Sequence, residues 1–183
     1  MNGSPDLFSI HRLVWIALMA ALMAVGAVIS IPLPFSPVPV SLQTLFVLLA
    51  GLILGPRDGA IAMLVYLAAG CLGLPVFTGG KSGLAALLGP TGGFLVGFIP
   101  SAVICGFAKK TGATSFVVLL AYCALGTTVT LALGTAHLAT LLKISLGKAV
   151  ALGVVPFLPG AALKCLGAAA IYRFLAVRKL LPV

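Results

Sequence analysis

A single lysine inside an apolar stretch is the residue of this chain best placed to bind a ligand. Lys164 follows the segment 155–163, VPFLPGAAL, in which Pro159 suits the start of a helix. The ammonium then lies in the first turns of that helix, near the positive end of the helix dipole. With no acid nearby in the sequence, a buried cation needs an anion, carbonyl groups or a water-filled cavity. We interpret Lys164 as part of a ligand site; the alternative is that its ammonium extends to the nearest water.

Catalysis would need partner groups that this sequence lacks. There is no Glu, and the two acids are Asp6 and Asp58, so paired-carboxylate chemistry is excluded. His137 has no acid beside it, and a lone His more often hydrogen-bonds a carbonyl than carries protons. Because no nucleophile–base pair can be assembled, an enzyme is not expected.

The four cysteines are expected to be structural. They lie far apart, without any C-x-x-C spacing, and each sits in an apolar run, where Cys behaves as a small hydrophobic residue. Neither a zinc site nor a disulfide framework is expected, and no cofactor is required. They are Cys71, Cys105, Cys123 and Cys165.

The segment 79–82, GGKS, has the end of a phosphate-loop motif but not its beginning. That motif has its first glycine five residues before the glycine that precedes the lysine, here Gly80, and this chain has Pro75 at that position. Nucleotide binding is therefore not expected. Lys81 and Ser82 belong instead to a glycine-rich loop, which is either a plain outer connection or a loop that closes over a ligand.

The composition is that of a membrane protein. Of the 183 residues, 62% are hydrophobic and 7% are charged, whereas a soluble domain has about a quarter of its residues charged. The formal net charge is +9, but the cations are scattered singly, so nucleic-acid binding is not expected. We expect residues 1–183 to form one all-α integral membrane domain surrounded by lipid.

Six transmembrane helices are expected. The uncharged stretch 13–56 is more than twice the ~20 residues that cross a bilayer, so it must contain two helices. Four prolines between positions 32 and 39 favour an extended proline-rich loop over 30–40, with Ser41 capping the next helix. The expected helices cover 12–30, 41–55, 58–72, 90–108, 114–134 and 160–178.

Two long outer loops are expected, before the fourth and the sixth helix. They cover 73–89, which is rich in glycine, and 135–159, which contains His137. Non-helical backbone at membrane depth must be covered by protein or line a water-filled cavity. Both loops are therefore expected to act as lids over a covered space.

The distribution of Lys and Arg predicts that both termini are cytoplasmic. With the N-terminus inside, seven cations lie on that side and three lie outside, while Lys164 remains in the sixth helix. The inner set is Arg12, Arg57, Lys109, Lys110, Arg173, Arg178 and Lys179, and the outer set is Lys81, Lys143 and Lys148.

Small residues recur at helical spacing in two of the expected helices. Such stripes let membrane helices approach each other closely. For the fourth helix, packing within the domain is favoured; for the first, internal packing and docking on another protein both remain open. The first helix carries Ala17, Ala20, Ala21 and Ala24, and the fourth carries Gly89, Gly93, Gly97 and Ser101.

Several phrases, taken together and in order, resemble the BioY family, the biotin-binding S components of energy-coupling factor (ECF) transporters. The resemblance covers about residues 13 to 180. The phrases are SIPLPFSPVPVSLQTL at 30–45, LGP at 54–56, GLPVF at 73–77, LGPTGGF at 88–94 and PFLPG at 156–160.

This resemblance implies a six-helix protein of a bacterial or archaeal cytoplasmic membrane that captures biotin from outside with high affinity. It also implies that the alanine stripe of helix 1 docks on a transmembrane T component, which carries two ABC ATPases that hydrolyse the ATP. The S component is then expected to topple in the membrane to release biotin inward. Whether the chain also forms a homo-oligomer stays open, and the closest alternative is an S component for a different vitamin.

The chemistry of biotin, set against the polar residues near the outer ends of the helices, indicates which residues could hold it. Biotin has an apolar bicycle and chain, a carboxylate and a ureido group, which suit a concave apolar site with a few polar groups. Family members commonly carry an acid three residues before the lysine, where this chain has Ala161, and Lys81 is a candidate to compensate. The expected binding residues are Lys164, Gln43, Thr44, Lys81, Ser82 and Thr91.

Overall fold

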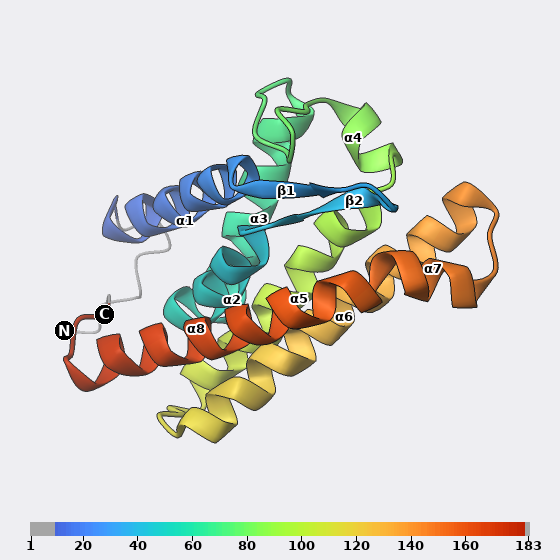
Figure 1. Cartoon of the computed structure of the whole chain (residues 1–183). Coiled ribbons are helices and arrows are strands. Elements are labelled where there is room, and N and C mark those ends of the chain that lie inside the picture. Colours follow the sequence, from blue (N-terminus) through green and yellow to red (C-terminus); the bar gives the residue numbers. More distant parts are fainter. Residues whose placement is uncertain (1–9, 182–183) are drawn as a thin grey trace.

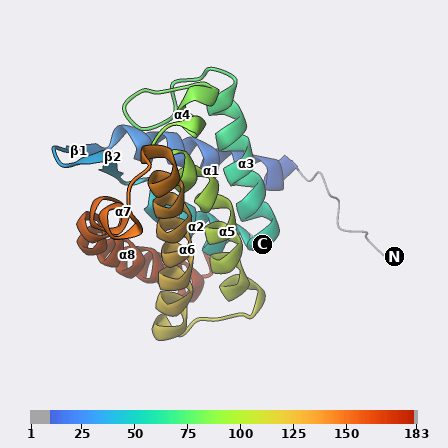
Figure 2. The same cartoon turned by 90° about the vertical axis from the view of Figure 1, so that its right-hand side faces the viewer.

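The computed structural model describes residues 10–181, which form eight α-helices and one β-hairpin (Figure 1). Helices α5 and α6 pack side by side along most of their length (Figure 2). In chain order the elements are α1 Ile10–Val28, β1 Ser30–Leu33, β2 Ser36–Ser41, α2 Gln43–Leu54, α3 Pro56–Cys71, α4 Leu84–Leu88, α5 Gly92–Lys110, α6 Phe116–Leu142, α7 Leu146–Gly153, the 3-10 turn Val155–Phe157 and α8 Leu158–Val177.

The long helices follow the apolar runs of the sequence. Helices α1, α2, α3, α5 and α8 begin and end within two residues of the expected bounds. Pro56 supplies the first residue of α3, where its missing N–H costs no helical hydrogen bond. Pro159 plays the same part in the first turn of α8, as expected.

The proline-rich segment was expected to be an extended loop. It forms an antiparallel hairpin instead. Ser30 pairs with Ser41 and Leu33 pairs with Ser36, with an irregularity between Ile31 and Leu33. Ser36, Val40 and Ser41 are the paired positions of β2, so Pro37 and Pro39, which have no N–H to donate, are not among them. The expected N-cap at Ser41 is also wrong, because its hydroxyl donates to the side chain of Gln43 instead of to the backbone of α2.

The second expected outer loop, 135–159, is largely helical. Helix α6 continues past residue 134 to Leu142, and it ends where Lys143 adopts a left-handed conformation with φ of 52°. His137 lies inside this helix, and its Nε2 lies 3.0 Å from the carbonyl oxygen of Gly89. The rest of the segment is occupied mainly by α7 and the 3-10 turn. The first expected loop also contains a short helix, α4.

Close helix contacts at glycines build the core. A Cβ at Gly51 of α2 would lie 2.3 Å from the carbonyl oxygen of Ala102 in α5. A Cβ at Gly93 of α5 would lie 2.3 Å from Cβ of His137 in α6. The glycine stripe of α5 therefore packs inside the domain, as expected, and helices at such distances gain contact along their backbones.

Four helical segments in the described part of the chain are long and apolar enough to cross a membrane, judged by length and composition. They are Ile10–Val28, Gly92–Lys110, Phe116–Leu142 and the stretch Leu146–Val177, which includes α8. Helix α2 is apolar but shorter. The chain is thus a mostly helical membrane protein.

An ion pair connects the first turns of α1 and α3. Nε of Arg12 donates to Oδ2 of Asp58 at 2.6 Å, and its Nη2 donates to Oδ1 of the same carboxylate. A two-pronged arginine–carboxylate contact fixes the relative orientation of its partners. At the other end of α1, the backbone N–H of Leu42 donates to the carbonyl oxygens of Gly26 and Ile29, at 3.1 and 3.0 Å.

Candidate functional site

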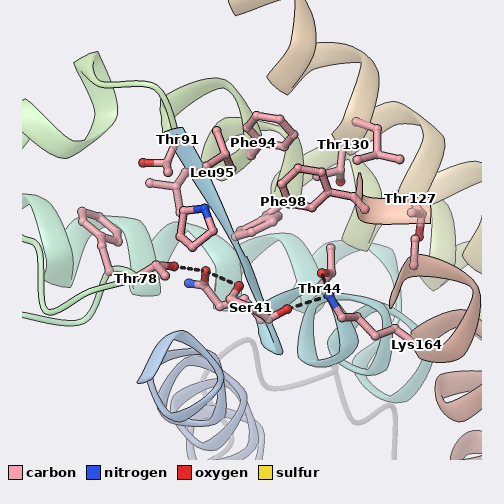
Figure 3. Close-up of a pocket in the computed structure, with 17 residues that line it drawn as sticks. Ser41, Thr44, Thr78, Thr91, Phe94, Leu95, Phe98, Thr127, Thr130 and Lys164 are labelled. Atoms are coloured by element: carbon pink, nitrogen blue, oxygen red, sulfur yellow. Dashed lines mark hydrogen bonds between the residues drawn. The ribbon is translucent and has the colours of Figure 1, made fainter. Parts of the chain in front are cut away.

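A cavity lies between the hairpin and helices α2, α5, α6 and α8 (Figure 3). The space inside it, counted together with open solvent at its mouth, is about 650 Å³. Its lining residues are Val38, Pro39, Ser41, Gln43, Thr44, Phe77, Thr78, Thr91, Phe94, Leu95, Phe98, Thr127, Thr130, Leu131, Phe157, Ala161 and Lys164.

Lys164 extends from α8 to the polar side of this cavity (Figure 3). Its Nζ donates to the carbonyl oxygen of Ser41 at 2.6 Å and to Oγ1 of Thr44 at 3.0 Å. An ammonium has three hydrogens to donate, so one remains for a ligand. Within residues 10–181 the one acid is Asp58, which is bound to Arg12, so Lys164 has no carboxylate partner in that range. The site therefore offers an uncompensated positive charge.

Gln43 is the centre of a second polar group and is 2% exposed. Its Oε1 accepts hydrogen bonds from the hydroxyls of Ser41, at 3.0 Å, and Thr78, at 2.8 Å. Its Nε2 donates to the hydroxyl of Tyr66, which in turn donates to the carbonyl oxygen of Val76 at 2.9 Å. Gln43 thus joins the start of α2, helix α3 and the loop after α3, and it holds the hydroxyls of Ser41 and Thr78 in place at the cavity wall.

Replacing Gln43 with leucine should destabilise the protein by about 1–3 kcal/mol, because buried hydroxyls lose their partners. Thermal unfolding of the purified variant in detergent measures this loss. Thr128→Val is a matched control, since that exposed hydroxyl bonds only within its own helix, to the carbonyl oxygen of Ala124. Equal unfolding temperatures for the two variants would show that the Gln43 network carries no stability.

The remaining walls are apolar and aromatic, with two threonines on α6. Phe94 stacks on Phe157, with ring centroids 5.9 Å apart. Oγ1 of Thr130 donates to the carbonyl oxygen of Gly97 at 3.2 Å, and Oγ1 of Thr127 lies 3.3 Å from the sulfur of Cys165. Both threonines are nearly buried, so they add polar atoms to an otherwise apolar surface.

Sequence reasoning identified part of this cavity. Four of the six expected binding residues line it: Lys164, Gln43, Thr44 and Thr91. It missed Thr78, Thr127 and Thr130, although two threonines three residues apart in an apolar helix are a usable signal. Ala161 also lines the cavity, one turn before Lys164, so an acid at this position would face the ligand space.

Lys81 and Ser82 are not among the residues that line this cavity. The backbone N–H of Phe77 donates to the carbonyl oxygen of Lys81 at 3.0 Å, closing a turn in which Gly79 and Gly80 have φ of 76° and 70°. Lys81 lines a separate groove, formed mainly by the hairpin, that shares Pro39 and Thr78 with the cavity. The GGKS segment is thus a tight turn outside the cavity, and a role for it in binding stays a prediction.

The alanine stripe of α1 is divided between two environments. Ala17 and Ala21 are exposed, while Ala20 and Ala24 are half-buried and pack against the core of the protein itself. Exposed Val14, Leu18 and Val25 continue the outer part of this face. The stripe therefore contributes both to internal packing and to an open apolar surface.

A mostly apolar cavity with a few directed polar groups, set between apolar helices of membrane-spanning length, defines a membrane-embedded small-molecule-binding protein. Comparison with known proteins shows which membrane proteins this chain is similar to. The "Biotin transporter BioY" of Rhizobium etli is 39% identical over 90% of this chain and 92% of its own. The "Probable biotin transporter BioY" of Pyrococcus horikoshii is 41% identical over 78% of this chain and 82% of its own.

The fold has a solved counterpart. A crystal structure of the S-component for biotin from an ECF-type ABC transporter superposes with a TM-score of 0.86 at 30% identity, covering 94% of each chain. A sequence model of the BioY family matches residues 1–182. The chain belongs to the BioY family, a family of transporters and not of enzymes.

Proposed function

We propose that this chain captures biotin in the membrane as the substrate-specific S component of an ECF-type transporter. The observation that carries the proposal is the cavity in which Lys164 keeps one unused donor and an uncompensated charge. The names of the similar proteins supply the ligand, since they are described as biotin transporters and as an S-component for biotin.

Biotin matches this cavity group by group. Its bicycle and aliphatic chain suit the phenylalanines of α5 and the 3-10 turn, Phe94, Phe98 and Phe157. Its polar ends need donors and acceptors, which Lys164 and the threonines provide. Thr44 and Thr91 remain proposed binding residues; Gln43 acts by holding Ser41 and Thr78.

Isothermal titration calorimetry of the detergent-purified chain with biotin tests this function directly. The expected result is saturable binding at one site per chain. Riboflavin and thiamine serve as controls, because an S component for a different vitamin is the nearest alternative. Saturable binding of another vitamin without binding of biotin would overturn the assignment of the ligand.

Six membrane crossings are proposed, with α1, α2, α3, α5, α6 and α8 as the spans and both termini in the cytoplasm. The even number of crossings places the start of α1 and the end of α8 on one side. The Lys and Arg excess on that side supports a cytoplasmic orientation.

This orientation predicts the accessibility of single cysteines introduced at Ser82 and Lys110 in a background without the native cysteines. Ser82→Cys should react with a membrane-impermeant maleimide added to intact cells, and Lys110→Cys should react only after the cells are opened. Reaction at position 110 in intact cells would reverse the orientation.

We further propose that α1 docks on a T component that carries two ABC ATPases, through the exposed part of the alanine stripe. The support is the small-residue surface formed by Ala17 and Ala21, which would let a partner helix approach closely. Because ATP would be hydrolysed by the partner, this chain needs no phosphate loop of its own.

A further inference from the structure

A groove separate from the cavity lies where α6 begins and α8 ends. Phe116, the first residue of α6, forms one side. The last turns of α8 form the other, with Ala170, Arg173, Phe174, Val177 and Arg178.

The α8 residues of this groove share one face of the helix, because they recur three or four positions apart. Phe174 and Val177 are 56% and 70% exposed, whereas Ala168 and Tyr172 of the same turns are buried in the core. The α8 residues of the groove are therefore on the side of this helix that is turned away from the core.

The groove joins positive charge to an apolar surface. The guanidinium of Arg178 lies over the ring of Phe174, 5.2 Å from its centroid. Across residues 10–181 the one acid, Asp58, is bound to Arg12, so Arg173 and Arg178 have no carboxylate partner within the described chain. Two cations beside apolar side chains at a helix end suit an anionic group that also has an apolar part.

We propose that this groove binds an anionic phospholipid of the leaflet that surrounds the end of α8. The phosphate would lie between the guanidinium groups of Arg173 and Arg178, which suit phosphate oxygens. The acyl chains would lie along Phe116, Ala170, Phe174 and Val177. Basic pockets between transmembrane helices bind lipid headgroups in this way. The phosphate would balance the positive charge of Arg173 and Arg178, which no acid within residues 10–181 balances.

Native mass spectrometry of the purified chain, titrated with phosphatidylglycerol and separately with phosphatidylcholine, tests the site. Arg173→Gln/Arg178→Gln should weaken binding of the first phosphatidylglycerol about 25-fold, at roughly fivefold per arginine near a membrane surface. Ala170→Leu should also weaken it, because it fills the groove and keeps both charges. Phosphatidylcholine should bind the unaltered chain no better than it binds the double variant.

Arg57→Gln/Lys110→Gln is the matched control, since both side chains are exposed, are predicted to lie on the same side of the membrane and do not line the groove. The control should keep the affinity of the unaltered chain, and unfolding temperatures should show that all variants are folded. An equal loss in the control, or equal affinity for the two lipids, would overturn the proposal. If Arg173→Gln/Arg178→Gln leaves lipid binding unchanged but no longer co-purifies with the transporter subunits when they are expressed together, the groove is a protein-docking surface instead.

Discussion

Replacing Ala21 with tryptophan is expected to abolish biotin uptake by the assembled transporter. Ala21 lies on the exposed part of the α1 stripe, with Ala17 one turn before it. An indole there would hold a partner helix away, and close approach is what small-residue stripes provide. Binding of biotin by the isolated chain should stay within about twofold, because an exposed substitution usually changes stability by less than ~0.5 kcal/mol.

Uptake into cells that express the variant with its partner subunits, and calorimetry of the isolated variant, are the two measurements. Ala124→Trp is the control, since Ala124 is an exposed alanine of α6, a helix outside the proposed docking face. A parallel loss of uptake and binding in Ala21→Trp would indicate that Ala21 supports the fold of the chain itself. Normal uptake would place the docking surface elsewhere.

Replacing Lys164 with methionine is expected to weaken biotin binding roughly 10- to 150-fold, the equivalent of ~1.5–3 kcal/mol for a charge-assisted hydrogen bond. Methionine keeps much of the side-chain length and removes the ammonium. The remaining contacts of biotin with the apolar walls explain why binding should weaken and not disappear.

A comparison of biotin with its methyl ester shows whether Lys164 contacts the carboxylate end or the ureido end of the ligand. Biotin methyl ester should bind the unaltered chain much more weakly than biotin if the carboxylate is the partner. If the ester binds equally well and Lys164→Met still weakens binding, the ammonium contacts the ureido group. Lys148→Met, which removes an exposed cation of α7 outside the cavity, should bind biotin normally. Normal binding by Lys164→Met would exclude the lysine from the site.

The helices were predictable because long apolar runs and prolines determine them locally. The end of α6 was not, because a polar residue such as His137 does not by itself end a helix, and its contact with Gly89 joins residues 48 positions apart. The prolines of 30–40 excluded a helix but could not show that the segment pairs with itself. Strand register depends on the turn and on which face is buried, and here the hydroxyl of Ser36 bonds to the carbonyl oxygen of Leu152 in α7, at 2.8 Å.

The cavity was predictable where a polar residue is unusual in its surroundings. Lys164 stands out because a charge in an apolar run needs an explanation, and Gln43, Thr44 and Thr91 stand out as polar residues near helix ends. The aromatic walls could not be found in this way, because an apolar residue that faces the cavity has the same sequence pattern as one that faces the core or lipid. Ser41 was assigned to helix capping. Its carbonyl contact with Lys164 could not be predicted, because it joins residues 123 positions apart.

The attachment of α1 at both ends limits how this helix can move. Arg12 holds its beginning to α3, and the backbone of Gly26 and Ile29 holds its end to Leu42, at the entrance to α2. A hinge at either end of α1 would break one of these connections. A force applied to α1 from outside should therefore be transmitted to α3 at one end and to the start of α2 at the other, and not be absorbed by a hinge.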